Sequence, residues 1–174
     1  VSQGNHMLTM NDLVGNNAVA TWTNPSNPSD IVSFSVKKFN KIDRLTDVNN
    51  DIFYNVEFGK VEEINYESVD GKIVQGWVVK PPQFDSKKKY PLVLRIHGGP
   101  HSMYNVGFNY NFQLHAAQDQ VVLYTNPRGS TGYGYDFADA IQNAYPGNDY
   151  DDIMAGVDEI ISRGYIDENK MYVY

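Results

Sequence analysis

The chain has 174 residues, of which 41% are hydrophobic and 13% aromatic, and this composition suits a globular core and argues against disorder. Its formal net charge of −7 disfavours nucleic acids and anionic membranes as partners, because both require a basic surface. The absence of cysteine excludes disulfides, a thiolate nucleophile and cysteine-ligated metal, and no apolar run approaches the ~20 residues of a membrane-spanning helix.

The first fifty or so residues are typical of β-structure. Residues 18–23 and 31–36 alternate in polarity and are rich in strand-forming side chains, and the turn-rich segment 24–30 separates them. Residues 44–49 then close the unit. Two or three short strands cannot bury a core alone, so these residues are equally consistent with a generic hairpin and with one blade of a β-propeller.

Two further strands are predicted at residues 62–68 and 72–80, after a crossing segment at 53–59. The sequence VDG at 69–71 joins them, and Asp-Gly between two β-rich runs is the strongest short signal of a hairpin. Two prolines at 81–82 end the second strand, because proline has no N–H to donate to a sheet.

A third strand over residues 92–96 is apolar and stops at HGGPH, residues 97–101. The two glycines let the backbone turn sharply and approach another molecule, and the proline cannot continue the strand. Ligands of open α/β sheets bind at this carboxyl end of the strands. His-Gly-Gly after a buried strand is also the pattern of the oxyanion loop of α/β-hydrolases, where a backbone N–H helps to hold a developing negative oxygen.

The remaining elements are predicted from periodicity and punctuation. They are a helix over 108–118, a strand over 121–125 followed by NPRGSTGYG at 126–134, a helix over 135–143, a helix capped by Asn148 and ended by Gly164, and a strand from Met171 to Tyr174. Asp149, Asp151 and Asp152 suit the first turn of the helix after Asn148, because the helix dipole favours negative charge there.

Four blocks in this order resemble the prolyl oligopeptidase family of serine peptidases, and most closely its acylaminoacyl-peptidase and dipeptidyl-peptidase-V-like branch. They are HGGPH at 97–101, NPRGSTGYG at 126–134, YPGND at 145–149 and GYID at 164–167. The resemblance covers residues 62–174, and more loosely the residues before them. It implies an α/β fold: the N-terminal half of an α/β-hydrolase sheet with strand order 1-2-4-3-5, preceded by a short all-β segment resembling the last blade of a β-propeller. The expected domains are residues 1–55, the end of the propeller-like domain, and 56–174, a partial peptidase domain.

The catalytic residues of such a fold are expected outside these 174 residues. The serine belongs to a G-x-S-x-G elbow straight after the fifth strand, and the acid and histidine follow it in chain order. No serine of this chain has that context, so the whole triad is expected after Tyr174 and the chain alone is predicted to be inactive. Ser130 follows the fourth strand, and we interpret it as a loop serine that hydrogen-bonds its own backbone.

The candidate site residues lie in the two glycine-rich blocks. His97, Gly98 and Gly99 form the expected oxyanion loop, in which the histidine shapes the loop. Arg128, Gly129, Ser130 and Tyr133 form a loop at the same edge of the sheet. The five donors of an arginine fork can tie a carboxylate or several carbonyls together, so Arg128 is either a structural brace or a substrate contact.

The other histidines predict no metal site. His101 is interpreted as a second loop-shaping residue, and His6 and His115 as surface or packing residues. No spacing typical of a metal site occurs, and no cofactor is expected.

The resemblance therefore implies a serine-type peptidase that hydrolyses short peptides, with this chain supplying the scaffold and the oxyanion loop. Its expected partners are short peptide substrates and the remainder of the same peptidase chain, without nucleic acid or membrane, and homo-oligomerisation stays open. We expect a soluble protein of the cytoplasm or periplasm. Two alternatives are a carboxylesterase or lipase, many of which share His-Gly-Gly, and a truncated, inactive binding or scaffold protein.

Overall fold

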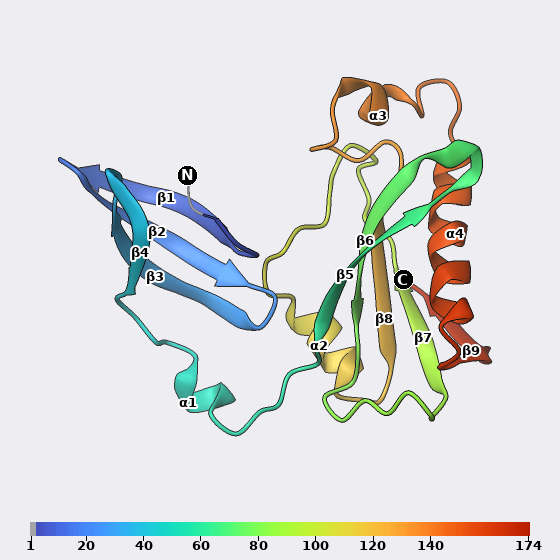
Figure 1. Cartoon of the computed structure of the whole chain (residues 1–174), viewed down its shortest axis with the longest axis horizontal. Coiled ribbons are helices and arrows are strands. Elements are labelled where there is room, and N and C mark those ends of the chain that lie inside the picture. Colours follow the sequence, from blue (N-terminus) through green and yellow to red (C-terminus); the bar gives the residue numbers. More distant parts are fainter. Residues whose placement is uncertain (1–2) are drawn as a thin grey trace. The chain divides into compact units, whose positions relative to one another are not determined.

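The computed structural model describes residues 3–174, with no side chains given for 39 and 40, and the chain divides into two compact units (Figure 1). One unit holds the residues up to Glu57 together with Asn105–Tyr110, and the other holds Phe58–Tyr104 and Asn111–Tyr174.

The first unit is a four-stranded antiparallel meander that resembles a propeller blade. Its strands are β1 (Met7–Val14), β2 (Asn17–Asn24), β3 (Asn27–Ser35) and β4 (Lys38–Arg44), hydrogen-bonded in that order. A small apolar cluster of Ala18, Ala20, Val32 and Phe34 is its core. Sequence analysis missed β1 because most of its side chains are exposed and do not alternate in polarity. A short helix, α1 (Asn50–Phe53), follows the meander.

The second unit is built on a mixed five-stranded sheet. Its strands are β5 (Val61–Glu67), β6 (Ile73–Val79), β7 (Tyr90–Arg95), β8 (Val121–Asn126) and β9 (Ile166–Val173). The order across the sheet is β5-β6-β8-β7-β9, which confirms the predicted order 1-2-4-3-5. β5 and β6 form the predicted hairpin through a single 3-10 turn at Val69–Gly71. β7 runs parallel to both β8 and β9, so the carboxyl ends of these three strands share one edge.

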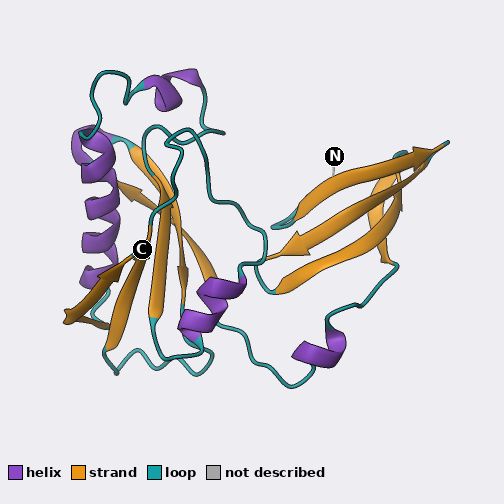
Figure 2. Cartoon of the chain, turned by 180° about the vertical axis from the view of Figure 1, so that it is seen from behind, coloured by secondary structure: helices purple, strands orange, loops and turns teal. Residues whose placement is uncertain are grey.

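Helices cover the two faces of this sheet, as Figures 1 and 2 show. They are α2 (Tyr110–Ala116) on one face and α4 (Asn148–Ser162) on the other, while the short helix α3 (Tyr135–Asp139) lies beyond the ends of the strands. Side chains alternate between the two faces of a strand. Leu123 of β8 packs in the cluster that holds Ile160 of α4. Tyr124 faces the other side, where its ring centroid lies 4.5 Å from that of Phe112 on α2. Because both faces of β8 are covered, its sequence is an almost unbroken apolar run.

Several element ends differ from those predicted. Gly147, not Asn148, is the N-cap of α4, and no side chain caps that end; instead the Gly147 N–H donates to the Asp149 carboxylate at 2.7 Å. α3 ends at Asp139 rather than 143. β9 begins five residues before Met171, because polar residues at 167–170 hide the start of the strand from a periodicity argument. The end of α4 is as predicted, since Gly164 adopts a left-handed φ of 84° directly after it.

Gly156 of α4 lies where the helix packs closely against Tyr66 of β5. A Cβ at this position would lie 2.7 Å from the Tyr66 hydroxyl, which itself donates to the Asp152 carbonyl. Alanine is the better helix former by about 1 kcal/mol, but overpacking costs about 1–3 kcal/mol. We therefore expect Gly156→Ala to lower the free energy of unfolding, measured by denaturant titration.

The neighbouring Ala155→Gly variant measures the helix-propensity term together with the loss of the methyl contact that the partly buried Ala155 makes with the core. A Gly156→Ala chain that is more stable than wild type by the amount lost in Ala155→Gly would show that Tyr66 does not pack against α4 as described.

Candidate active-site loops

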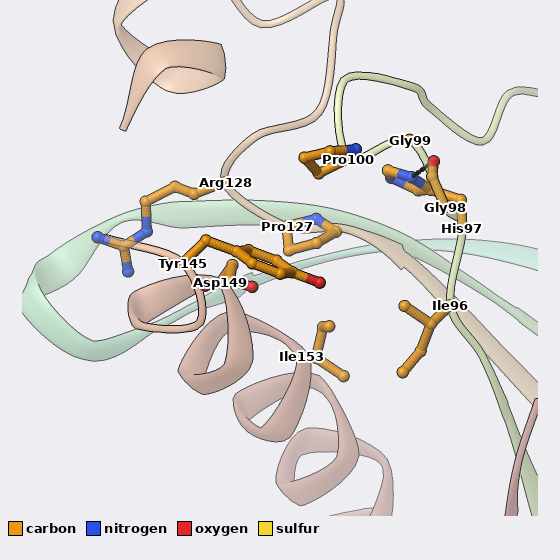
Figure 3. Close-up of a pocket in the computed structure, with 10 residues that line it drawn as sticks. All are labelled: Ile96, His97, Gly98, Gly99, Pro100, Pro127, Arg128, Tyr145, Asp149 and Ile153. Atoms are coloured by element: carbon orange, nitrogen blue, oxygen red, sulfur yellow. Dashed lines mark hydrogen bonds between the residues drawn. The ribbon is translucent and has the colours of Figure 1, made fainter. Parts of the chain in front are cut away.

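HGGPH, residues 97–101, leaves the sheet at the carboxyl end of β7, and Gly98, Gly99 and Pro100 are exposed there. The loop borders a cavity of about 340 Å³ (Figure 3). The cavity is lined by Ile96, His97, Gly98, Gly99, Pro100, Pro127, Arg128, Tyr145, Asp149 and Ile153. Sequence analysis placed the first loop at this edge but did not identify Tyr145, Asp149 and Ile153 as lining residues. Tyr145 and Asp149 belong to the motif YPGND, which was part of the family resemblance but did not indicate that they would line a cavity.

The loop that follows β8 holds the HGGPH loop in place. The His97 Nε2 and the Ser130 Oγ lie 2.9 Å apart, and the His101 Nδ1 lies 3.0 Å from the Gly129 carbonyl oxygen. A backbone bond of 2.9 Å from the Thr131 N–H to the Ser102 carbonyl adds a third tie. Both histidines therefore join this loop to its neighbour.

The His97–Ser130 pair resembles a catalytic base with its nucleophile, but its contacts and burial indicate that it holds the loop in place. The other ring nitrogen, Nδ1, lies 3.2 Å from the Gly98 carbonyl, which can only accept a hydrogen bond. The contact with this carbonyl favours the tautomer with hydrogen on Nδ1, in which Nε2 accepts from the Ser130 hydroxyl. Ser130 is fully buried, so no substrate reaches its oxygen. The Ser130 side chain was expected to bond its own backbone, and the structure places its oxygen beside a ring nitrogen 33 residues away.

Gly99 has a backbone conformation that only glycine adopts without strain. Its φ is 136°, and a Cβ there would lie 3.0 Å from the Ser102 Cβ and 3.2 Å from the His101 nitrogen. Within residues 3–174, the Gly99 N–H has no hydrogen-bond partner. An exposed N–H on a turn that the neighbouring loop holds in place is a preorganised donor for an anionic or developing negative oxygen.

Arg128 is a brace between three elements. Its Nε and Nη2 donate to the two oxygens of Asp152 on α4 at 2.9 and 2.7 Å, its own backbone N–H donates to the same carboxylate, and its Nη1 donates to Asp70 in the β5–β6 turn. The Asp152 side chain is fully buried, whereas that of Asp70 is half exposed. The hydrogen bonds to Asp152 raise the pKa of the guanidinium above its already high value. In Figure 3 the guanidinium points away from residues 97–100.

The sequence left a structural brace and a substrate contact open for Arg128 and did not indicate its partners. Asp152 was assigned to the first turn of a helix, where an acidic residue needs no further explanation, and Asp70 to a turn. Tyr133 is not among the residues that line the cavity. Its hydroxyl instead accepts from the Asn126 side chain and donates to the Gln75 side chain. In the part of the chain that the structure describes, no cluster of three metal-ligating side chains occurs, and no helix is long and apolar enough to cross a membrane.

Comparison with known proteins agrees with this geometry. Residues 106–174 match the family model described as the prolyl oligopeptidase family. Over this segment the chain is similar to that family. The uncharacterized peptidase YuxL of Bacillus subtilis is 41% identical over 156 residues, which are 89% of this chain and 23% of YuxL. Dipeptidyl-peptidase 5 of Schizosaccharomyces pombe is 38% identical over 113 residues, which are 63% of this chain and 16% of that protein.

Solved structures extend the likeness to nearly the whole chain. The acylaminoacyl peptidase of Pyrococcus horikoshii superimposes with a TM-score of 0.86 and 26% identity, over 98% of this chain and 27% of that one. An acylaminoacyl peptidase in complex with Z-Gly-Gly-Phe-chloromethyl ketone gives a TM-score of 0.87 at the same identity. The chain thus spans only about a quarter of these proteins.

The brace generates a stability prediction. Asp152→Asn removes the negative charge that compensates a buried guanidinium, and breaking a buried pair in this way costs about 3–5 kcal/mol. Asp70→Asn removes a half-exposed partner and should cost about 1 kcal/mol or less; asparagine also tolerates the φ of 69° at this position. Denaturant unfolding of both variants checks this, and equal losses would mean that Asp152 is not the principal partner of Arg128.

Proposed function

We propose that the whole protein is a serine-type peptidase that hydrolyses short peptides, and that this chain supplies the oxyanion loop and the scaffold around it. The observation that carries the proposal is the exposed N–H of Gly99, held beside a cavity at the carboxyl ends of three parallel strands. The peptidase names of the relatives and of the similar structures support it and disfavour an esterase or a lipase.

The chemistry follows from the geometry of acyl transfer. A serine from the rest of the protein, activated by a histidine that an acid orients, would attack the peptide carbonyl, and its oxygen would gain negative charge. The Gly99 N–H would donate to that oxygen beside a second N–H from the residue after the serine. His97 and Ser130 hold the loop and transfer no proton in this scheme, since His97 already accepts from a buried hydroxyl. The first unit would form the end of a propeller that admits only short peptides to the active site.

A fluorophosphonate probe on the full-length protein tests the assignment. We expect stoichiometric labelling of one serine that lies outside residues 1–174, together with loss of hydrolysis of dipeptide or acyl-aminoacyl anilides. Mass spectrometry locates the labelled serine. A label on Ser130, or a full-length protein that hydrolyses simple esters but no peptide, would contradict the proposal.

The role of Gly99 is tested by Gly99→Ala in the full-length protein. The strained φ and the crowding by Ser102 should turn the N–H away from the substrate oxygen, and loss of one such donor costs about 10²–10³ in kcat. KM should change much less, because the interaction forms mainly in the transition state.

Gly164→Ala is the matched control, since Gly164 also has a positive φ, of 84°, but lies past the end of α4 with no atom near the added Cβ. It should lose stability and keep its kcat. If a folded Gly99→Ala enzyme also keeps its kcat, the loop is only a turn.

A further inference from the structure

Asn126 is the last residue of β8 and is fully buried. Its side-chain amide binds the backbone of Tyr104, three residues after the HGGPH loop. Its Oδ1 accepts the Tyr104 N–H at 2.7 Å, and its Nδ2 donates to the Tyr104 carbonyl at 3.0 Å. The side chain thus makes the paired bonds that a neighbouring strand would make, at a point where the loop has no strand beside it.

A chain of hydrogen bonds fixes the orientation of this amide. A carboxylate only accepts, so the Glu63 side chain draws the Gln75 Nε2 toward it, at 2.6 Å. The Gln75 Oε1 then accepts from the Tyr133 hydroxyl, and the Tyr133 oxygen accepts from the Asn126 Nδ2 at 2.7 Å. The Asn126 Oδ1 is left to face the Tyr104 N–H. Burial raises the pKa of the Tyr133 hydroxyl, which keeps it protonated and able to donate.

Tyr104 carries the constraint to the oxyanion loop. Its ring packs edge-on against the His97 ring, with centroids 5.3 Å apart and an angle of 77° between the planes. It also lies edge-on to the rings of Phe112 and Tyr124. His97 is therefore fixed at its ring nitrogens by Ser130 and Gly98, and at its ring face or edge by Tyr104.

We propose that Asn126 is a positioning residue of the active site, which acts through Tyr104 and His97 to hold the Gly99 N–H in place. The proposal rests on the proposed function for its effect on catalysis. Its structural half, that the Asn126 amide orders residues 97–104, stands independently of any activity.

The test is Asn126→Asp in the full-length protein, compared with wild type across pH. The ionised carboxylate that this change introduces accepts the Tyr104 N–H but repels the Tyr104 carbonyl, so kcat should fall by about tenfold or more at pH 8, with KM nearly unchanged. Burial raises the pKa of a carboxyl group, and its protonated form donates to the carbonyl as the amide does. The ratio of variant to wild-type kcat should therefore rise as the pH is lowered, a rescue that a loss of packing would not produce.

Gln113→Glu is the matched control. The Gln113 side chain is also buried and makes the same pair of bonds, accepting the Gly59 N–H at 2.7 Å and donating to the Gly59 carbonyl at 3.1 Å, but it does not contact the HGGPH loop. Gln113→Glu should lower the stability of the protein, but its ratio of variant to wild-type kcat should stay the same across pH. An equal dependence in both variants, or a folded Asn126→Asp enzyme with wild-type kcat at pH 8, would overturn the proposal.

Hydrogen exchange of the amides of residues 97–104 separates the two hypotheses. Faster exchange in Asn126→Asp than in wild type and Gln113→Glu supports the positioning role even if the wild-type protein hydrolyses no peptide, in which case the proposed function alone fails. If Asn126→Asp does not fold, Tyr133→Phe replaces it, because that change leaves Asn126 in place and removes the hydroxyl that accepts from its amide and donates to Gln75. Unchanged exchange of residues 97–104 in a folded variant would overturn the inference.

Discussion

A loop with an exposed N–H can stabilise a developing charge only if it does not move, and the HGGPH loop has no secondary structure of its own. Its order comes from the parallel pairing of β7 and β8, which brings two glycine-rich loops to one edge of the sheet. The second loop then supplies Ser130 and the Gly129 carbonyl as partners for the side chains of His97 and His101, and Asn126 at the end of β8 holds the backbone of Tyr104. Preorganised dipoles of this kind cost no reorganisation when charge develops.

The second loop is in turn tied to the rest of the unit by a buried charge. Burying a guanidinium is unfavourable unless its donors are satisfied, and Arg128 is satisfied only when α4 and the β5–β6 turn are both in place. The brace therefore makes the position of the loop after β8 depend on the tertiary fold. A chain in which α4 does not dock leaves that charge unpaired and both loops without support.

Much of this fold follows from local sequence patterns, and the two loops from their glycines. The strands β7 and β8 and the hairpin were predicted because apolar runs are bounded by turn signals and Asp70-Gly71 marks a tight turn, whereas the strand order was predicted from the family resemblance. The partners of Arg128 and Ser130 could not be predicted from local patterns. Asp152 and Asp70 lie 24 and 58 residues from Arg128, and His97 lies 33 residues from Ser130. Asn126 was missed for a similar reason: an asparagine before a proline indicates a turn, and nothing local shows that its amide pairs with Tyr104.

The most direct test of the account is a crystal structure of the full-length protein with a phosphonate bound covalently to its catalytic serine. The phosphonyl oxygen stands in for the carbonyl oxygen of the transition state. The account predicts this oxygen within about 2.7–3.1 Å of the Gly99 nitrogen, with His97 still bonded to Ser130. An oxygen held by other donors, with Gly99 facing solvent, would contradict it.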